Sequence, residues 1–197
     1  MCFAVNRLNV LCLQKCRFFR FKRGDRMLSE TEKEKILDRV AKKAGDYEES
    51  AVSCSQGTLV ALQEEFNLGG GSDVIKAAIF MPGMASRKET CGALVGGLMA
   101  LGLKFGRDKI RDPEPDTPEG REELFKLREK AWRFCEEFKK EFGSTMCGDI
   151  RPKIMGRDYN SMDPRERQQF FDDDGPKKCR VPAEKAARIA TSIILEK

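Results

Sequence analysis

Apolar side chains recur every three to four residues along much of this chain, and this helical period limits its fold more than any other feature. The clearest example predicts a helix over residues 30–44, whose apolar face consists of Ile36, Leu37, Val40, Ala41 and Ala44. Ser29 and Glu32 form the capping box that typically opens such a helix. No segment shows the alternation of apolar and polar residues that is typical of a half-buried strand. The pattern therefore predicts an all-α fold.

Capping and helix-breaking residues divide the rest of the chain. We expect Gly45 to end the first helix, and Asp46 with Glu49 to open a second one. The expected later helices are 47–67, 72–80, 91–105, a long helix from Thr117-Pro118 to Gly143, and a last helix opened by Pro182. Two long polar loops, 106–117 and 148–180, separate them. The sequence thus predicts one domain over residues 27–197, a small bundle of about five to six helices.

The positive charge is concentrated in the first 26 residues. They hold seven Lys/Arg and one Asp, whereas the remainder holds 30 basic and 31 acidic residues. A neutral body lacks the basic surface of nucleic-acid-binding proteins, so we expect no nucleic-acid partner. We expect residues 1–26 to be a disordered basic extension or the product of an upstream start, with translation beginning at Met27. A basic arm that binds nucleic acid or a membrane is the alternative interpretation.

Hydropathy favours a cytoplasmic protein. The longest uncharged apolar stretch, Cys91 to Leu103, has thirteen residues, four of them glycine. A membrane span needs about 20 apolar residues, so we expect no membrane segment. Charges interrupt every apolar run near the N-terminus, unlike in a signal peptide. In the cytoplasm, the eight cysteines are more typical of metal binding or redox chemistry than of structural disulfides.

The chain contains no histidine, and this narrows what the cysteines can do. It excludes His-ligated haem, mixed Cys–His zinc sites and catalysis by a Ser–His or Cys–His pair. Any metal must be bound through thiolate, carboxylate or backbone oxygen. A set of thiolates alone suits an iron–sulfur cluster or zinc.

Three cysteines fall at or near expected helix ends. Cys91 lies in the first turn of one helix, Cys179 just before the last helix, and Cys147 in the tight segment after the long helix. Free amide groups and the positive end of the helix dipole stabilise a thiolate at such positions. Cys54 is expected within the second helix, beside small residues.

Cys135 differs from these four because it lies on the apolar face of the long helix. We expect it to be a buried core thiol. Trp132, the only tryptophan, neighbours the same face, and we expect it to be partly buried.

Small residues follow Cys91 in two rows along its helix. The rows consist of Gly92, Gly96 and Ala100, and of Ala93 and Gly97. A glycine inside a helix costs about 1 kcal/mol relative to alanine, so several of them indicate a specific need. The rows suit close packing of another helix or close approach of an inorganic cluster. The second interpretation makes Gly92 and Gly96 cofactor-binding residues.

The chain resembles the C-GCAxxG-C-C family, which is described as redox-active. The resemblance rests on the CGAxxG motif of residues 91–96 and on the single cysteines Cys54, Cys147 and Cys179. The neighbouring segments 54–56, 99–106 and 138–147 also match, so that the resemblance covers roughly residues 46–195. One departure lies just before Cys91, where the glycine-rich stretch of the family is reduced to Gly83.

This resemblance implies that Cys54, Cys91, Cys147 and Cys179 meet at one site. We expect them to bind an iron–sulfur cluster and to take part in electron transfer with a redox partner protein. Two alternatives use the same cysteines: a metal-free thiol–disulfide protein, and a non-catalytic site with zinc bound by four thiolates. Whether the chain is an enzyme stays open, and a homodimer is compatible with the sequence.

Overall fold

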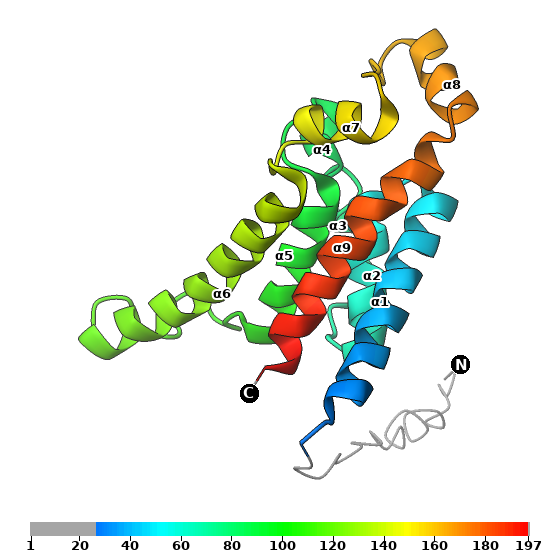
Figure 1. The fold of residues 1–197 in the computed structure, drawn as a ribbon. Coiled ribbons are helices and arrows are strands. Elements are labelled where there is room, and N and C mark those ends of the chain that lie inside the picture. Colours follow the sequence, from blue (N-terminus) through cyan, green and yellow to red (C-terminus); the bar gives the residue numbers. More distant parts are fainter. Residues whose placement is uncertain (1–26, 197) are drawn as a thin grey trace, which may run out of the picture.

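A computed structural model describes residues 27–196 (Figure 1). Over this range the chain forms nine helices and, apart from one isolated bridge, no β-structure, which confirms the all-α prediction. The expected count of five to six helices is too low. The extension predicted for residues 1–26, with Cys2, Cys12 and Cys16, lies outside the described residues.

The helices have the following bounds: α1 Glu30–Ala51, α2 Cys54–Phe66, α3 Gly71–Ala77, α4 Gly83–Ser86, α5 Gly92–Phe105, α6 Pro118–Phe142, α7 Cys147–Met155, α8 Pro164–Asp172 and α9 Gly175–Leu195. None of the helices in the described range is both long enough and apolar enough to cross a membrane.

Helices α1, α2, α5 and α9 form the central bundle. α1 packs along α9 and α2, and both α2 and α9 also pack on α5. Val40, Leu59, Ala93 and Ile193, one from each helix, are fully buried between them. α6 leans against α5 and α9 at its C-terminal half and projects away from the bundle at the other, while α4, α7 and α8 lie together at one end (Figure 1).

α1 continues through Gly45, where a helix end was predicted. This glycine is buried against α9, because a Cβ placed on it would lie 2.4 Å from Oε1 of Glu184. Asp46 forms no capping box with Glu49. Its carboxylate pairs instead with Arg180 of α9 at 2.8 Å. The predicted second capping box is wrong because close contact with α9, rather than a helix end, explains the glycine and the acidic residues.

The break between α1 and α2 comes at Val52, seven residues after Gly45. Val52 adopts a left-handed conformation with φ of 51° and ends α1. α2 then begins at Cys54. Cys54 is therefore the first residue of a helix. The prediction that it lies inside a helix is wrong.

The last helix also begins earlier than predicted. Pro176 stands in the first turn of α9, where a missing amide hydrogen needs no partner, and Pro182 lies inside the helix. The loop predicted over residues 148–180 is largely helical, since α7, α8 and the start of α9 occupy it. α7 and α8 are short, and the segment between them begins at Gly156 and ends at Asp163. Glycine and aspartate at these positions favoured the prediction of a loop.

The predicted long helix is confirmed as α6. The Thr117 hydroxyl accepts a hydrogen bond from the amide of Gly120 at 3.0 Å, and Gly143 ends the helix with φ of 72°. Cys135 is half-buried against the core. Trp132 is 71% exposed, so its predicted partial burial is wrong.

Candidate site of four cysteines and a buried glutamate

Cys54 lies where α2 approaches the start of α5. A Cβ placed on Gly92 would lie 2.4 Å from Sγ of Cys54 and 2.8 Å from Cα of Pro82. Gly92 therefore leaves the space that the Cys54 thiol uses. Any side chain larger than hydrogen at Gly92 would push either the sulfur or the backbone of Pro82 away.

Cys91 and Cys147 are brought together by a short backbone pairing. The amide of Cys91 donates to the Thr145 carbonyl at 2.8 Å, and the amide of Cys147 donates to the Glu89 carbonyl at 2.7 Å. Between these bonds, Thr90 and the residue opposite form the isolated antiparallel bridge. Cys91 caps the N-terminus of α5, and Cys147 is the first residue of α7, so the pairing joins two helix starts.

Cys179 reaches the same region from α9. It lies in the second turn of that helix, not just before a helix as predicted. Burial raises the pKa of its thiol most, and the charges of Glu48, Cys147 and Cys91 raise it further.

The four cysteines act on one another electrostatically. Burial raises the pKa of Cys54, and the charges of Glu48, Cys91, Cys179 and Cys147 raise it further. The pKa of Cys135 is also raised by burial, but the charge that adds to this effect is Glu136 of its own helix. The Cys54 thiol is therefore within electrostatic reach of the other three candidate cysteines, whereas the only charge found to act on Cys135 within residues 27–196 is that of Glu136.

Burial outweighs the expected effect of the helix ends on these thiols. It raises the pKa of Cys91 to about 12, with a contribution from Cys147, although the amides of Ala93 and Leu94 lower it. The pKa of Cys147 is raised by burial as well, against the opposite effect of Arg151. Without a bound cation the thiols are therefore neutral at physiological pH, so the predicted stabilisation of thiolates by helix ends alone is wrong.

Sequence reasoning missed Glu48. It is 3% exposed, and its Oε2 has no hydrogen-bond partner. Burial raises the pKa of its carboxyl group to about 8. The signal was present, because Glu48 follows Val40 and Ala44 at the same spacing of four and so continues the apolar face of α1. The helix end predicted at Gly45 concealed it.

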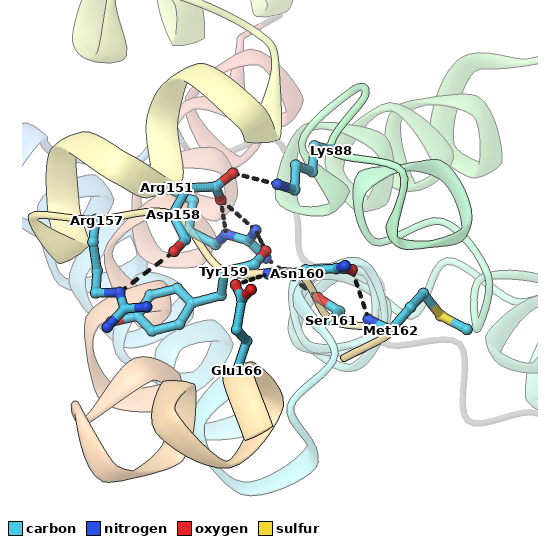
Figure 2. Close-up of polar contacts among 9 residues, drawn as sticks. All are labelled: Lys88, Arg151, Arg157, Asp158, Tyr159, Asn160, Ser161, Met162 and Glu166. Atoms are coloured by element: carbon cyan, nitrogen blue, oxygen red, sulfur yellow. Dashed lines mark hydrogen bonds and ion pairs between the residues drawn. The ribbon is translucent and has the colours of Figure 1, made fainter. Parts of the chain in front are cut away.

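A polar cluster lies beside Cys147, at the end of α7. Figure 2 shows Asp158 between Lys88 and Arg151, and both cations hydrogen-bond to its carboxylate, Arg151 through Nε at 3.2 Å. Burial alone would raise the pKa of Asp158, but hydrogen bonds from Lys88 and Arg151 outweigh it and hold the pKa at about 2. The charges of Arg151 and Lys88 also lower the pKa of Cys147.

An uncharged hollow of about 430 Å³ opens next to Cys54. It is lined by Ala51, Val52, Ser53, Ile79, Phe80, Pro82, Ala85 and Ser86. Phe80 is 74% exposed at its edge, and the buried Oγ of Ser53 has no hydrogen-bond partner. The hollow thus brings an apolar surface close to the cysteines.

The donor set suits a thiophilic metal, because four sulfurs and one carboxylate share the region and the chain has no imidazole. As the side chains stand, however, no three Cys, Asp or Glu within residues 27–196 are arranged to hold a metal ion. The five cysteines of that range are all free. Binding a metal would therefore require some of these side chains to turn.

The neighbours of the two candidate glycines differ. A Cβ on Gly96 would lie 2.3 Å from the Ser55 carbonyl oxygen, so Gly96 lets α2 pack on α5. Gly97 does the same for α6, since its Cβ would lie 2.3 Å from the Phe134 ring. Of the two, Gly92 is the one that borders a candidate sulfur ligand.

Comparison with known proteins identified a family that this chain matches. A model of the family described as "Putative redox-active protein (C_GCAxxG_C_C)" matches residues 52–193, more than half of the chain. This span includes the CGAxxG motif and all four candidate cysteines but not Glu48. No curated protein and no solved structure matched the chain.

Proposed function

The chain belongs to the C_GCAxxG_C_C family, and from this premise we propose that Cys54, Cys91, Cys147 and Cys179 form one redox centre. In this proposal they bind an iron–sulfur cluster, and the protein exchanges electrons with a partner redox protein. The observation that supports it is that Sγ of Cys54 lies against Gly92, next to Cys91, while the backbone pairing holds Cys91 beside Cys147. The effect of Cys91 and Cys147 on the pKa of Cys179 agrees with this arrangement.

The chemistry of the donors favours a cation at this place. Four thiols and a carboxyl group lie together, and burial keeps all of them protonated. A metal centre replaces those protons, because a coordinating thiol is deprotonated outright. The amides of Ala93 and Leu94, in the first turn of α5, would then hydrogen-bond to a Cys91 sulfur that carries negative charge, which is the arrangement that helix N-termini stabilise.

The proposal assigns a role to each of the residues around the four cysteines. The four cysteines supply the sulfur ligands, Gly92 leaves room for the Cys54 sulfur, and Arg151 with Lys88 offsets negative charge near Cys147. An iron–sulfur cluster, when bound, supplies a reversible electron-transfer couple whose potential depends on nearby charge and solvent exposure.

A metal-free thiol–disulfide protein is the second candidate. It is favoured by the backbone pairing that holds Cys91 beside Cys147, and by the lack of a ready-made group of three metal donors within residues 27–196. In that case two thiols would join in a disulfide, and their two electrons and two protons would reduce a disulfide of a partner protein. A zinc site with four thiolates is a third use of the same residues.

One experiment separates these candidates. The full-length protein is purified without oxygen, and its iron, acid-labile sulfide, zinc and visible absorption are measured. Iron with sulfide and visible charge-transfer bands supports the cluster. A colourless protein with stoichiometric zinc supports the zinc site. A metal-free protein whose thiols oxidise in pairs supports the disulfide chemistry and contradicts our proposal.

A further inference from the structure

Glu48 is the one buried carboxylate of the site region whose burial nothing in the fold explains. It lies near the C-terminal end of α1, is 3% exposed, and has an unpartnered Oε2. A buried carboxyl group is normally hydrogen-bonded or paired with a cation, since burying it unpaired costs on the order of several kcal/mol. A buried carboxyl group whose Oε2 has no hydrogen-bond partner is therefore a candidate ligand for a bound cation.

Packing fixes Glu48 next to the start of α2. A Cβ on Gly57 would lie 2.8 Å from the backbone nitrogen of Glu48, so α1 and α2 cross at these two residues in close contact. Cys54 lies less than one turn before Gly57 on α2. The crossing therefore holds Glu48 close to the first turn of α2, where Cys54 lies.

The electrostatics agree with this placement. The charge of Glu48 raises the pKa of all four candidate cysteines, and for Cys54 and Cys179 it is the largest effect after burial. Burial is what raises the pKa of Glu48 itself, and no Lys or Arg within residues 27–196 acts to lower it. Lys88 and Arg151 act on Cys147 and are bound to Asp158.

We propose that Glu48 is a fifth ligand of the cysteine centre, binding through its carboxylate to one of the metal ions that the cysteines hold. This inference rests on the proposed function. It makes the site a mixed sulfur–oxygen site for a borderline divalent metal such as ferrous iron or zinc, both of which accept thiolate and carboxylate ligands. In a cluster, one iron would then differ from the others in its ligand. Glu48 lies outside residues 52–193, the span that the family model matches.

The test compares Glu48→Gln with Glu49→Gln in the full-length protein. Glutamine keeps the size of the side chain but removes its charge and most of its affinity for metal. Glu49 is the neighbouring residue, is exposed, and pairs with Arg180 at 2.6 Å, which makes it the matched control. Each protein is loaded with ferrous iron and sulfide without oxygen. The rate at which a chelator removes iron and the Mössbauer spectrum are measured per folded protein.

We expect Glu48→Gln to lose iron at least about tenfold faster than the wild type, because the loss of even an indirect partner of a metal site weakens it by that much. We also expect the Mössbauer signal of one iron to change, while Glu49→Gln matches the wild type. If Glu48→Gln does not fold, Glu48→Ala gives the same comparison.

Two results would overturn the inference, and they are distinguishable. If the wild type holds iron and Glu48→Gln matches it in release rate and spectrum, Glu48 is not a ligand although the proposed function stands. If the wild type binds neither iron nor zinc, the proposed function fails and the inference falls with it.

Discussion

At Gly92, the lack of a side chain lets a thiol from another helix reach the start of α5. The Cys54 sulfur and the Pro82 backbone occupy the space that a Cβ would need. Gly102, ten residues further along the same helix, has no atom within 4 Å of such a Cβ and is exposed. The two glycines therefore have opposite roles, although the sequence alone presents them as members of one glycine-rich segment.

We expect Gly92→Ala to destabilise the protein by about 1–3 kcal/mol, the usual cost of an extra methyl group in a filled space. It should also lower bound iron per folded protein, because Sγ of Cys54 must move. Gly102→Ala should stabilise the protein by about 0.5–1 kcal/mol, since it only removes the conformational freedom of glycine in a helix. Urea unfolding and iron analysis of both variants check this. Equal stability changes in the two variants would contradict the close contact at Gly92.

At the level of elements, α7 is held in place by groups at both of its ends. The amides of Cys147 and Gly148 donate to carbonyls of Glu89 and Lys88 at its start, and Arg151 within it binds Asp158. Lys88 also binds Asp158, so one carboxylate ties α7 to the segment that leads into α5 (Figure 2). The position of Cys147 depends on this network.

We expect Asp158→Asn to destabilise the metal-free protein by about 1 kcal/mol at pH 7, an amount kept small by partial solvent screening. The pKa of Asp158 is about 2 in the fold and 3.8 as the ordinary value. Its stabilising effect is therefore complete above about pH 4 and is lost as the pH falls through about 2. Wild type and variant should converge over that window in urea unfolding. Asp73→Asn, which affects only an exposed pair with Lys76, is the control and should leave the stability at pH 7 nearly unchanged.

Some elements could be predicted from local signals and others could not. The helix from Pro118 to Phe142 was predictable because Thr117 and Gly143 act as its cap and its end within the chain itself. Gly45 could not be interpreted correctly, because the reason for it is Glu184, far away in sequence on α9. Glu48 was missed for the same reason, since only the continuation of α1 places it on the buried face.

The four candidate cysteines show the same division. Their identity was available from the motif and the spacing, through the family resemblance that the comparison has confirmed. Their protonation was not, because it depends on burial. Sequence reasoning placed three thiols at helix ends and expected thiolates, whereas the packed helices raise the pKa of all four.

For the whole molecule, the helices from Glu30 onwards bury a continuous core between α1, α2, α5 and α9. α1 opens with a complete capping box, in which the Glu32 amide donates to Oγ of Ser29 at 3.3 Å. We therefore expect a chain that starts at Met27 to melt at the same temperature as the full-length chain. Calorimetry checks this, and a loss of several degrees would show that residues 1–26 belong to the fold.

The central claim is that cysteines from distant parts of the chain make one centre, and a series of single serine variants tests it most directly. The variants are Cys54→Ser, Cys91→Ser, Cys147→Ser and Cys179→Ser, with Cys135→Ser as the half-buried control. Iron per folded protein is measured after anaerobic purification. We predict that each of the four loses at least about nine-tenths of its iron or binds it about tenfold more weakly, since a lost ligand should cost no less than a lost indirect partner. Cys135→Ser should keep wild-type iron. Wild-type iron in any of the four variants, or equal loss in Cys135→Ser, would contradict a single centre built from these cysteines.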